Sequence, residues 1–236
     1  DTAHLSSISG GTDILSCFLL GCPILPVYAG ELQCAGLGMD VAVIDDDHKP
    51  LADGIGELIC RSPFVSQPLG LWGDDDQSRF KVEYFESVPG QWSQKDMVSR
   101  GESGGFVVHG RSDFTLNPGG VRIGTAEIYR ALEDVKGIDE AVVVGRNVDD
   151  DVLIELFLTM QPGFDCDGAV KSRTMKAIAA RCTRRHLPHR ITAVEDIPKT
   201  RNGKVSERAV QDAVNGREVA NIAQLINPEC LGQFFV

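Results

Sequence analysis

The stretch SISGGTDI at residues 7–14 combines residue types that bind phosphates in proteins: a glycine turn, a hydroxyl and a carboxylate. A glycine such as Gly11 lets backbone N–H groups come close to a phosphate oxygen. The Thr12 hydroxyl can donate a hydrogen bond to the same group, and the Asp13 carboxylate is an oxygen ligand of the kind Mg²⁺ prefers. This stretch therefore predicts a position for phosphate and Mg²⁺.

Two further stretches supply an acid and a pair of arginines. WSQKDM at residues 92–97 offers Asp96, whose carboxylate can accept hydrogen bonds from ribose hydroxyls. GRSDFTLNPGGVRIGTAEIYR at residues 110–130 places Arg111 and Arg122 on either side of a Gly-Gly loop. Guanidinium groups bind phosphate through paired N–H donors, so these arginines can hold an α-phosphate.

The fourth stretch is PKTRNGK at residues 198–204. Pro198 fixes its own φ and Gly203 permits a positive φ, so the residues between them can form a tight, exposed turn. A helix is predicted over residues 205–213, with Lys204 at its entry. A lysine on a turn tip is usually solvated surface, so this stretch alone assigns Lys204 no role.

Charge is distributed unevenly along the 236 residues, whose formal net charge is −11. Residues 1–60 hold nine acids and one base, whereas residues 171–208 hold eleven bases and three acids. A basic segment in an acidic chain predicts a local anion site, with phosphates as the natural ligands. The basic face at 171–190 could meet the phosphates of coenzyme A or be a solvated helix face. The segment lacks interleaved aromatic residues, which disfavours nucleic acid as a partner.

Composition predicts a globular protein with no membrane partner. The hydrophobic fraction is 42%, the charged fraction is 24%, and no apolar run reaches membrane-spanning length. The seven cysteines are odd in number and form no C-x-x-C pair, which is typical of reduced thiols in a cytoplasmic protein. Cys182, His186 and His189 are close in sequence, but the neighbouring arginines and the lack of a second ligand pair argue against a metal site there.

Strand-type patterns dominate the first part of the chain. Alternating and apolar runs predict strands over 39–45 and 56–61, joined by an acidic turn. Residues 61–100 show scattered aromatics and turn residues without a regular period. A short strand, a turn at 111–113, a second short strand and a Gly-Gly loop are predicted over 104–124.

The pattern changes at Thr125, which is expected to cap a helix with Ile128, Leu132 and Val135 on one face. Alternating strands and helices are expected beyond it: strands at 140–147, 152–160 and 191–198, and between the last two an amphipathic helix over 167–190 that buries Met175, Ile178, Ala179 and Cys182. The predicted fold class is α+β, with domains at 1–111 and 112–236.

The order and spacing of the four stretches resemble the adenylate-forming superfamily of acyl-CoA synthetases, adenylation domains and luciferases. Within it, the chain resembles the C-terminal part of the acetoacetyl-CoA synthetases. The resemblance covers nearly the whole chain and is carried by SISGGTDI, GELICRSPFVSQPLGLWGD, HGRSDFTLNPGGVRIGTAEIYRAL and PKTRNGKV. It implies the β-rich end of a large AMP-binding N-terminal domain, followed by a small mobile α+β C-terminal domain.

The resemblance also implies an activity. A carboxylate such as acetoacetate attacks the α-phosphate of ATP·Mg²⁺ to give an acyl-adenylate and diphosphate, and the thiol of coenzyme A then displaces AMP. The resemblance assigns roles to residues of this chain: nucleotide binding to Gly11, Thr12, Asp96, Arg111 and Arg122; the metal to Asp13; the domain hinge to Asp113; coenzyme A binding to Gly119 and Gly120; and catalysis, by bridging the carboxylate and the α-phosphate, to Lys204.

Two departures from the family pattern limit this expectation. The family's Ser/Thr/Gly-rich phosphate loop ending in Lys is not present, so the chain is expected to be a fragment that needs the missing N-terminal portion and is inactive alone. Gln94 and Lys95 stand where family members usually have His-Gly. The alternatives are a ligase for another short acid such as acetate, and a nucleotide- or coenzyme A-binding module or remnant without turnover.

Overall fold

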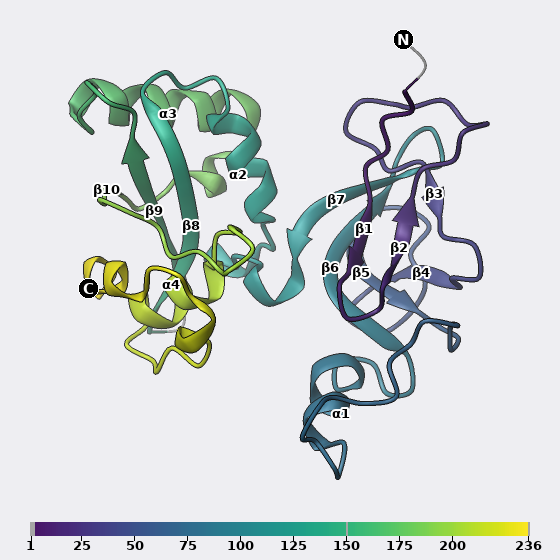
Figure 1. Ribbon diagram of the computed structural model, residues 1–236. Coiled ribbons are helices and arrows are strands. Elements are labelled where there is room, and N and C mark those ends of the chain that lie inside the picture. Colours follow the sequence, from purple (N-terminus) through teal and green to yellow (C-terminus); the bar gives the residue numbers. More distant parts are fainter. Residues whose placement is uncertain (1–2, 150, 236) are drawn as a thin grey trace. The chain divides into compact units, whose positions relative to one another are not determined.

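The computed structural model describes residues 3–149 and 151–235, with the backbone only at Gly120. The chain forms two compact units, residues 1–113 and residues 114–236, and each is described by itself (Figure 1). Within the described residues, no helix is long and apolar enough to cross a membrane.

In residues 3–113, the first unit folds into two antiparallel sheets and the α-helix α1. The smaller sheet has the strand order β1-β2-β3 and the larger has the order β4-β5-β6-β7. The elements are β1 (Ser9–Gly11), β2 (Ser16–Leu20), β3 (Cys34–Ala35), β4 (Val41–Ile44), β5 (Ile55–Cys60), α1 (Ser78–Phe85), β6 (Trp92–Arg100) and β7 (Phe106–Arg111).

The strands expected at 39–45 and 56–61 are confirmed as β4 and β5. The irregular stretch at 61–100, in contrast, contains α1 and the nine-residue strand β6, which the sequence pattern did not predict. The pairing of β6 with β5 and with β7 is interrupted by register shifts, so its side chains do not alternate cleanly between a buried and an exposed face.

An aromatic cluster joins α1 to β6. Trp92, at the start of β6, is 2% exposed and its ring stacks on Tyr84 of α1 with the ring centroids 3.9 Å apart. Phe64, Phe80 and Phe85 surround the same indole in edge-on orientations. All the aromatics of the irregular stretch except the exposed Trp72 therefore pack in the core of the first unit.

The second unit is a three-stranded sheet of order β10-β9-β8 with helices on both faces. Strands β8 and β9 are antiparallel, and β10 runs parallel to β9. The elements are α2 (Thr125–Leu132), β8 (Ile138–Val148), β9 (Asp151–Met160), α3 (Gly168–Arg181), β10 (Arg190–Ala193) and α4 (Glu207–Val214). Short 3-10 segments lie at Ser112–Phe114, Pro118–Gly120, Arg184–His186, Ile222–Gln224 and Pro228–Gln233.

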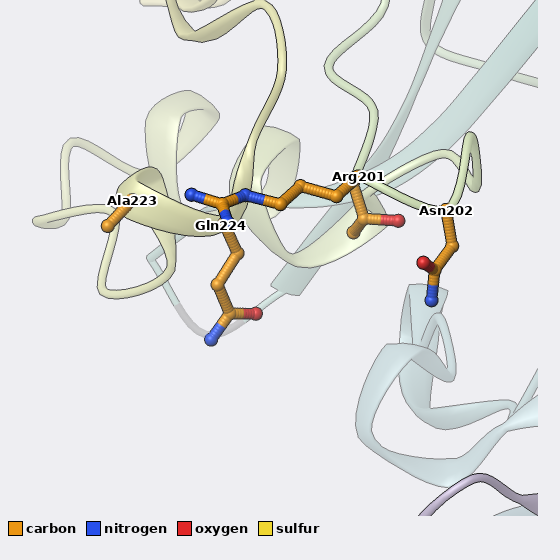
Figure 2. A pocket seen from close by; sticks show the side chains of 5 residues that line it. Arg201, Asn202, Ala223 and Gln224 are labelled. Carbon is orange, nitrogen blue, oxygen red and sulfur yellow. The ribbon is translucent and has the colours of Figure 1, made fainter.

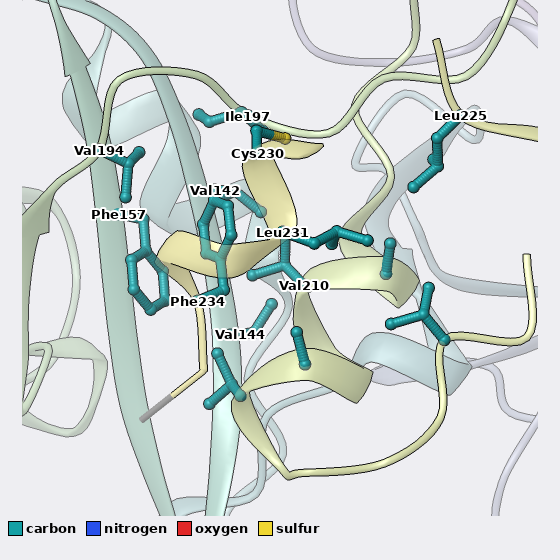
Figure 3. Close-up of a cluster of buried hydrophobic side chains, with 14 residues drawn as sticks. Val142, Val144, Phe157, Val194, Ile197, Val210, Leu225, Cys230, Leu231 and Phe234 are labelled. Atoms are coloured by element: carbon teal, nitrogen blue, oxygen red, sulfur yellow. The ribbon is translucent and has the colours of Figure 1, made fainter. Parts of the chain in front are cut away.

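Both faces of this sheet are covered, which explains why its strands read as continuous apolar runs. One face packs against α2 and α3, for example Leu156 with Ile128 and Ile178. The other face packs against α4 and the last 3-10 segment, where Phe157 meets Phe234 (Figure 3). Side chains alternate between the two faces along each strand, but both sets are buried.

Several helix details differ from the sequence-based expectations. Thr125 does not cap α2: Gly124 takes the cap position, and Thr125 is the first helical residue, 4% exposed. Val135 lies beyond the end of α2 but still packs in the same cluster. The expected second short strand is reduced to a single bridge between Leu116 and Ile123.

Helix α3 is shorter than expected. It begins after Asp167, whose side chain accepts a hydrogen bond from Val170 N, and it ends at Arg181. Ile178 faces the core as expected and Cys182 packs just past the helix, but Ala179 is exposed. The inward face of α3 follows the four-residue spacing of 170, 174 and 178, which points residue 179 away.

Candidate nucleotide site

In the first unit, the register of the paired strands determines which residues lie next to Asp96. Asp96 of β6 lies opposite Arg111 of β7, and its carboxylate accepts a hydrogen bond from the Ser9 hydroxyl of β1 at 2.8 Å. Burial raises the pKa of Asp96 above its ordinary value, and the Asp113 and Glu57 carboxylates act in the same direction. The Ser9 hydrogen bond and the Arg111 charge oppose this shift. Burial therefore makes the ionised form of Asp96 less stable than it would be in water.

Arg111 and Asp113 form a two-point ion pair at the end of β7. Nε and a terminal nitrogen of Arg111 each donate to a different oxygen of Asp113, both at 2.9 Å. Arg111 also experiences the charges of Asp96 and Glu83. The expected hinge residue is therefore tied to the expected nucleotide residue within one unit.

The glycine turn after β1 is filled by two side chains. A Cβ added at Gly11 would overlap Asp13 Oδ1 and lie 2.7 Å from Gln94 Nε2. Asp13 is partly exposed and hydrogen-bonds the hydroxyl of Tyr84, and Thr12 is exposed. Burial, together with Asp13, raises the pKa of Tyr84 well above its ordinary range, so Tyr84 stays protonated as a donor.

Lys95 adopts the backbone conformation that glycine favours. Its φ is 62°, in the left-handed region, and its Nζ forms an ion pair with Glu83 of α1 at 3.1 Å. The side chain of Lys95 is 17% exposed. The turn before Asp96 therefore keeps a glycine-like backbone although a lysine stands there.

In the second unit, the Gly-Gly loop is anchored at Gly119. The Gly119 N–H donates to Asp151 at 2.7 Å, and the Gly119 carbonyl accepts from Arg185 Nη1 at 3.3 Å. Gly119 has a φ of 57°, and a Cβ there would lie 3.0 Å from Arg185 Nη1. Arg122 is exposed. The environment of Gly120, the other expected coenzyme A residue, lies outside the described residues.

Lys204 stands on a turn whose backbone is closely fixed. Thr200 N donates to the Lys204 carbonyl at 2.8 Å, Gly203 N donates to Thr200 O at 2.8 Å, and Gly203 has a φ of 75°. The tight exposed turn predicted from the sequence is confirmed. Lys199 and Val205 form a bridge, and for this reason α4 begins at residue 207, two residues later than predicted.

The Lys204 side chain is exposed, and among the described residues it makes no hydrogen bond or ion pair. An open pocket of about 390 Å³ lies beside this turn, lined by Thr200, Arg201, Asn202, Ala223 and Gln224 (Figure 2). The residue before the turn is also held in place, because Lys199 Nζ forms an ion pair with Glu140 of β8 at 2.7 Å.

The expected site residues are thus divided between the units. The first unit holds Gly11, Thr12, Asp13, Asp96, Arg111 and Asp113, and the second holds Gly119, Gly120, Arg122 and Lys204. Sequence reasoning missed three further residues of the first site: Ser9, Tyr84 and Gln94. Ser9 lies inside the quoted glycine-rich motif, but Tyr84 comes from α1, which no sequence signal indicated.

A mixed cluster in the second unit resembles a metal site only superficially. Single ligand atoms of Glu127, Cys182 and His186 lie within 4.8 Å of one another. His186 Nε2 is already 2.9 Å from Glu127, and its Nδ1 accepts a hydrogen bond from Thr183 N. Burial raises the pKa of Cys182, which disfavours the thiolate that would bind a metal. These contacts close a short helical turn.

Comparison with solved structures defines the class of fold. An anthranilate CoA ligase, solved in complex with anthranoyl-AMP, matches 85% of this chain and 38% of its own, with a TM-score of 0.71 and 21% identity. The chain therefore has the fold of a part of the adenylate-forming acyl-CoA ligases.

Closer matches narrow the class. The structure of the acetoacetyl-CoA synthetase of Streptomyces lividans matches 98% of this chain with a TM-score of 0.90 and 37% identity, and 35% of its own chain is covered. The acetoacetyl-coenzyme A synthetase of Rhizobium meliloti (strain 1021) is 45% identical over 231 residues, 98% of this chain and 36% of that protein. No family model matches the chain. The chain is homologous to acetoacetyl-CoA synthetases and spans about a third of their length.

Proposed function

We propose that this chain forms part of an acetoacetate–CoA ligase, an acid–thiol ligase that converts ATP, acetoacetate and coenzyme A into acetoacetyl-CoA, AMP and diphosphate through an acyl-adenylate. The observation that carries the proposal is Lys204, an exposed lysine on a rigid turn, in a chain homologous to acetoacetyl-CoA synthetases. Because the chain spans about a third of its relatives' length, we propose that it turns over only together with the remaining portion of the enzyme.

In the first unit, the geometry supports ribose and phosphate binding. The Asp96 carboxylate accepts from the ribose hydroxyls, and Ser9 holds it in place. Arg111 contacts the nucleotide, and its two-point pair with Asp113 keeps the guanidinium oriented. Gly11 and Thr12 line the phosphates, since Thr12 is exposed and any Cβ at Gly11 would displace Asp13.

Asp13 suits Mg²⁺ as one ligand of a cation shared with ATP. Its carboxylate is partly exposed and carries a hydrogen bond from Tyr84, which orients it without neutralising it. Mg²⁺ is typically held by one or two carboxylates together with substrate phosphates and waters, so a single such oxygen ligand is sufficient. When bound, the ion supplies charge neutralisation of the phosphates.

In the second unit, Lys204 bridges the acid carboxylate and the α-phosphate, and Arg122 assists at the phosphate. A positive charge delivered to the reacting phosphate in this way lowers the activation barrier by about 3 kcal/mol or more. Gly119 and Gly120 border the path of the coenzyme A thiol. Arg185, which holds the Gly119 carbonyl, links this loop to the basic segment at 171–190. Asp113, at the end of the first unit, acts as the hinge about which the second unit moves between the two half-reactions.

Acetoacetate-dependent release of diphosphate from ATP tests the proposal. The full-length enzyme that carries this chain is compared with Lys204→Ala, and Lys49→Ala, an exposed lysine with a 72% exposed side chain, is the matched control. We expect a loss of more than about 100-fold for Lys204→Ala and none for the control. Assays with acetate and other short acids in place of acetoacetate determine which acid is the preferred substrate.

Four results would contradict the proposal. Unchanged turnover in Lys204→Ala would remove the catalytic role of that lysine, and a preference for acetate would change the substrate. Nucleotide binding without any diphosphate release in the full-length protein would favour a binding module. Turnover by the 236-residue chain alone would refute the need for the remaining portion.

A further inference from the structure

Gln94 has an orientation that its neighbour fixes. The Trp92 indole N–H donates to Gln94 Oε1 at 2.9 Å. Indole offers only a donor, so the amide must turn its oxygen toward Trp92 and its NH₂ group away. Trp92 itself is 2% exposed and packed against four aromatic rings, so the amide is attached to one of the most closely packed points of the first unit.

The free end of this amide lies over the glycine turn. Gln94 Nε2 is 2.7 Å from the position that a Cβ of Gly11 would occupy, and Asp13 Oδ1 overlaps that same position. A donor and a carboxylate therefore lie next to each other at the turn. Among the described residues, Gln94 Nε2 meets no hydrogen-bond acceptor within bonding geometry, although the residue is only partly exposed. Such a donor is ready for an acceptor supplied by a ligand.

We propose that Gln94 is a further ligand-binding residue, whose Nε2 donates a hydrogen bond to a phosphate oxygen of the nucleotide seated on the turn of residues 10–13. This inference rests on the proposed function. The Asp13 carboxylate alone would repel a phosphate and can hold it only through Mg²⁺. The neutral N–H donor of Gln94 beside it can bind a phosphate oxygen directly. An amide does not titrate, so the donor itself is unchanged across the physiological pH range.

A structural role of Gln94 and a ligand role use different ends of the amide. Packing requires only Oε1, which accepts from Trp92, whereas ligand binding requires only Nε2. Gln94→Glu keeps an oxygen for Trp92 and removes the donor. Gln94→Met removes both polar ends without adding charge, which separates loss of the donor from charge repulsion. Gln94→His restores a donor whose charge depends on pH.

The test measures the KM for Mg·ATP in acetoacetate-dependent diphosphate release, in the full-length enzyme, with the melting temperature of each variant as the check on folding. We expect Gln94→Met to raise this KM about tenfold, equivalent to about 1.4 kcal/mol, and Gln94→Glu to raise it further. The KM for acetoacetate should stay unchanged. Gln94→His should bind ATP more tightly as the pH falls through about 6.5, where imidazole becomes a cation.

The outcomes separate the two proposals. If the wild-type enzyme releases diphosphate and both Gln94→Met and Gln94→Glu keep its KM for Mg·ATP, the role of Gln94 is refuted and the proposed function stands. Equal rises in the KM for ATP and for acetoacetate would indicate a general distortion and also refute the role. If the wild-type enzyme releases no diphosphate, the proposed function fails, and the inference that rests on it fails too.

Discussion

The two units present their expected functional residues in opposite ways. In the first unit, Asp96 and Arg111 are placed by strand register, and hydrogen bonds or ion pairs hold their side chains. In the second unit, the backbone around Lys204 is closely bonded while its side chain is exposed and makes no contact among the described residues. Under the proposed function, the nucleotide residues are held in place before the ligand binds, whereas Lys204 is presented by a rigid turn with its side chain exposed.

The difference extends to the cores beneath the two sites. Trp92 is at once the centre of an aromatic cluster and the anchor of Gln94, so site and core of the first unit share a residue. Beneath Lys204, the core residues Val210 and Ala209 belong to α4 and lie outside the turn itself. Substitutions should therefore couple stability to the site in the first unit and separate the two in the second.

The largest expected effect is that of Trp92→Ala. Removing a fully buried indole from a packed core costs about 3–5 kcal/mol, and here it also frees the Gln94 amide. We expect local unfolding of the first unit, seen as faster hydrogen–deuterium exchange in β6 and α1, while β8 and β9 of the second unit keep their protection.

Lys204→Ala provides the contrast. Because its side chain is exposed and unpaired among the described residues, we expect a change in stability within about 0.5 kcal/mol and unchanged exchange in both units. Equal destabilisation by the two substitutions would refute the distinction between a site built into a core and a residue carried on a turn.

The sequence predicted the second unit better than the first. Strands β8 and β9 were visible as long apolar runs, and Pro198 with Gly203 was enough to predict the turn before Lys204. Strand β6 was missed because its bulges break the alternation that marks a strand. Ala179 was misplaced because a wide apolar stripe was assumed for a helix that buries a narrower one.

The site was predictable where a motif carried it and unpredictable where the fold did. Asp96 and Arg111 lie in recognisable sequence motifs, but their position opposite each other depends on the register of β6 with β7. Tyr84 reaches Asp13 only because α1 packs on β6, a contact that no local pattern encodes. The glycine-like backbone of Lys95 was hidden because the residue itself gives the opposite signal.

A smaller effect is expected from Asp96→Asn, which should stabilise the first unit at pH 7. Burial raises the pKa of Asp96, so the folded state pays to keep the carboxylate ionised, and the amide removes that cost. The folded pKa is above the unfolded value of about 3.9, so the gain is full above the folded pKa and disappears as the pH falls to the unfolded pKa. Urea unfolding between pH 4 and pH 8 measures it.

The same variant sharpens the functional side of the comparison. Asp96→Asn should weaken nucleotide binding while raising stability, the pattern of a group held in place for a ligand at the expense of the fold. Ser9→Ala is the matched variant: it removes the hydrogen bond that lowers the pKa of Asp96 and should destabilise at pH 7. A gain from Asp96→Asn that is the same at pH 4 and pH 8 would exclude the electrostatic explanation.

Lys95 allows a comparison of glycine with alanine at one position. Lys95→Ala keeps the left-handed backbone strain and loses the ion pair with Glu83, whereas Lys95→Gly relieves that strain. We expect the glycine variant to be more stable than the alanine variant by about 1 kcal/mol, measured by chemical unfolding. The opposite order would show that residue 95 does not adopt the left-handed conformation in solution.

The smallest expected effect concerns the support of the Lys204 turn. Glu140 pairs with Lys199, and its hydrogen bond raises the pKa of that lysine. The pair is partly solvated, so Glu140→Gln should cost less than about 1 kcal/mol, and less still at high salt. Because the folded pKa of Lys199 is raised, the pair contributes fully below the unfolded value of about 10.4 and is lost as the pH rises through the folded value. If the turn is a support for Lys204, Glu140→Gln should raise the activation free energy of turnover with acetoacetate by more than it lowers the free energy of unfolding. In a background of Lys204→Ala, the same substitution should cause no additional loss of turnover. Full additivity of the two losses would mean that Glu140 acts on the fold alone.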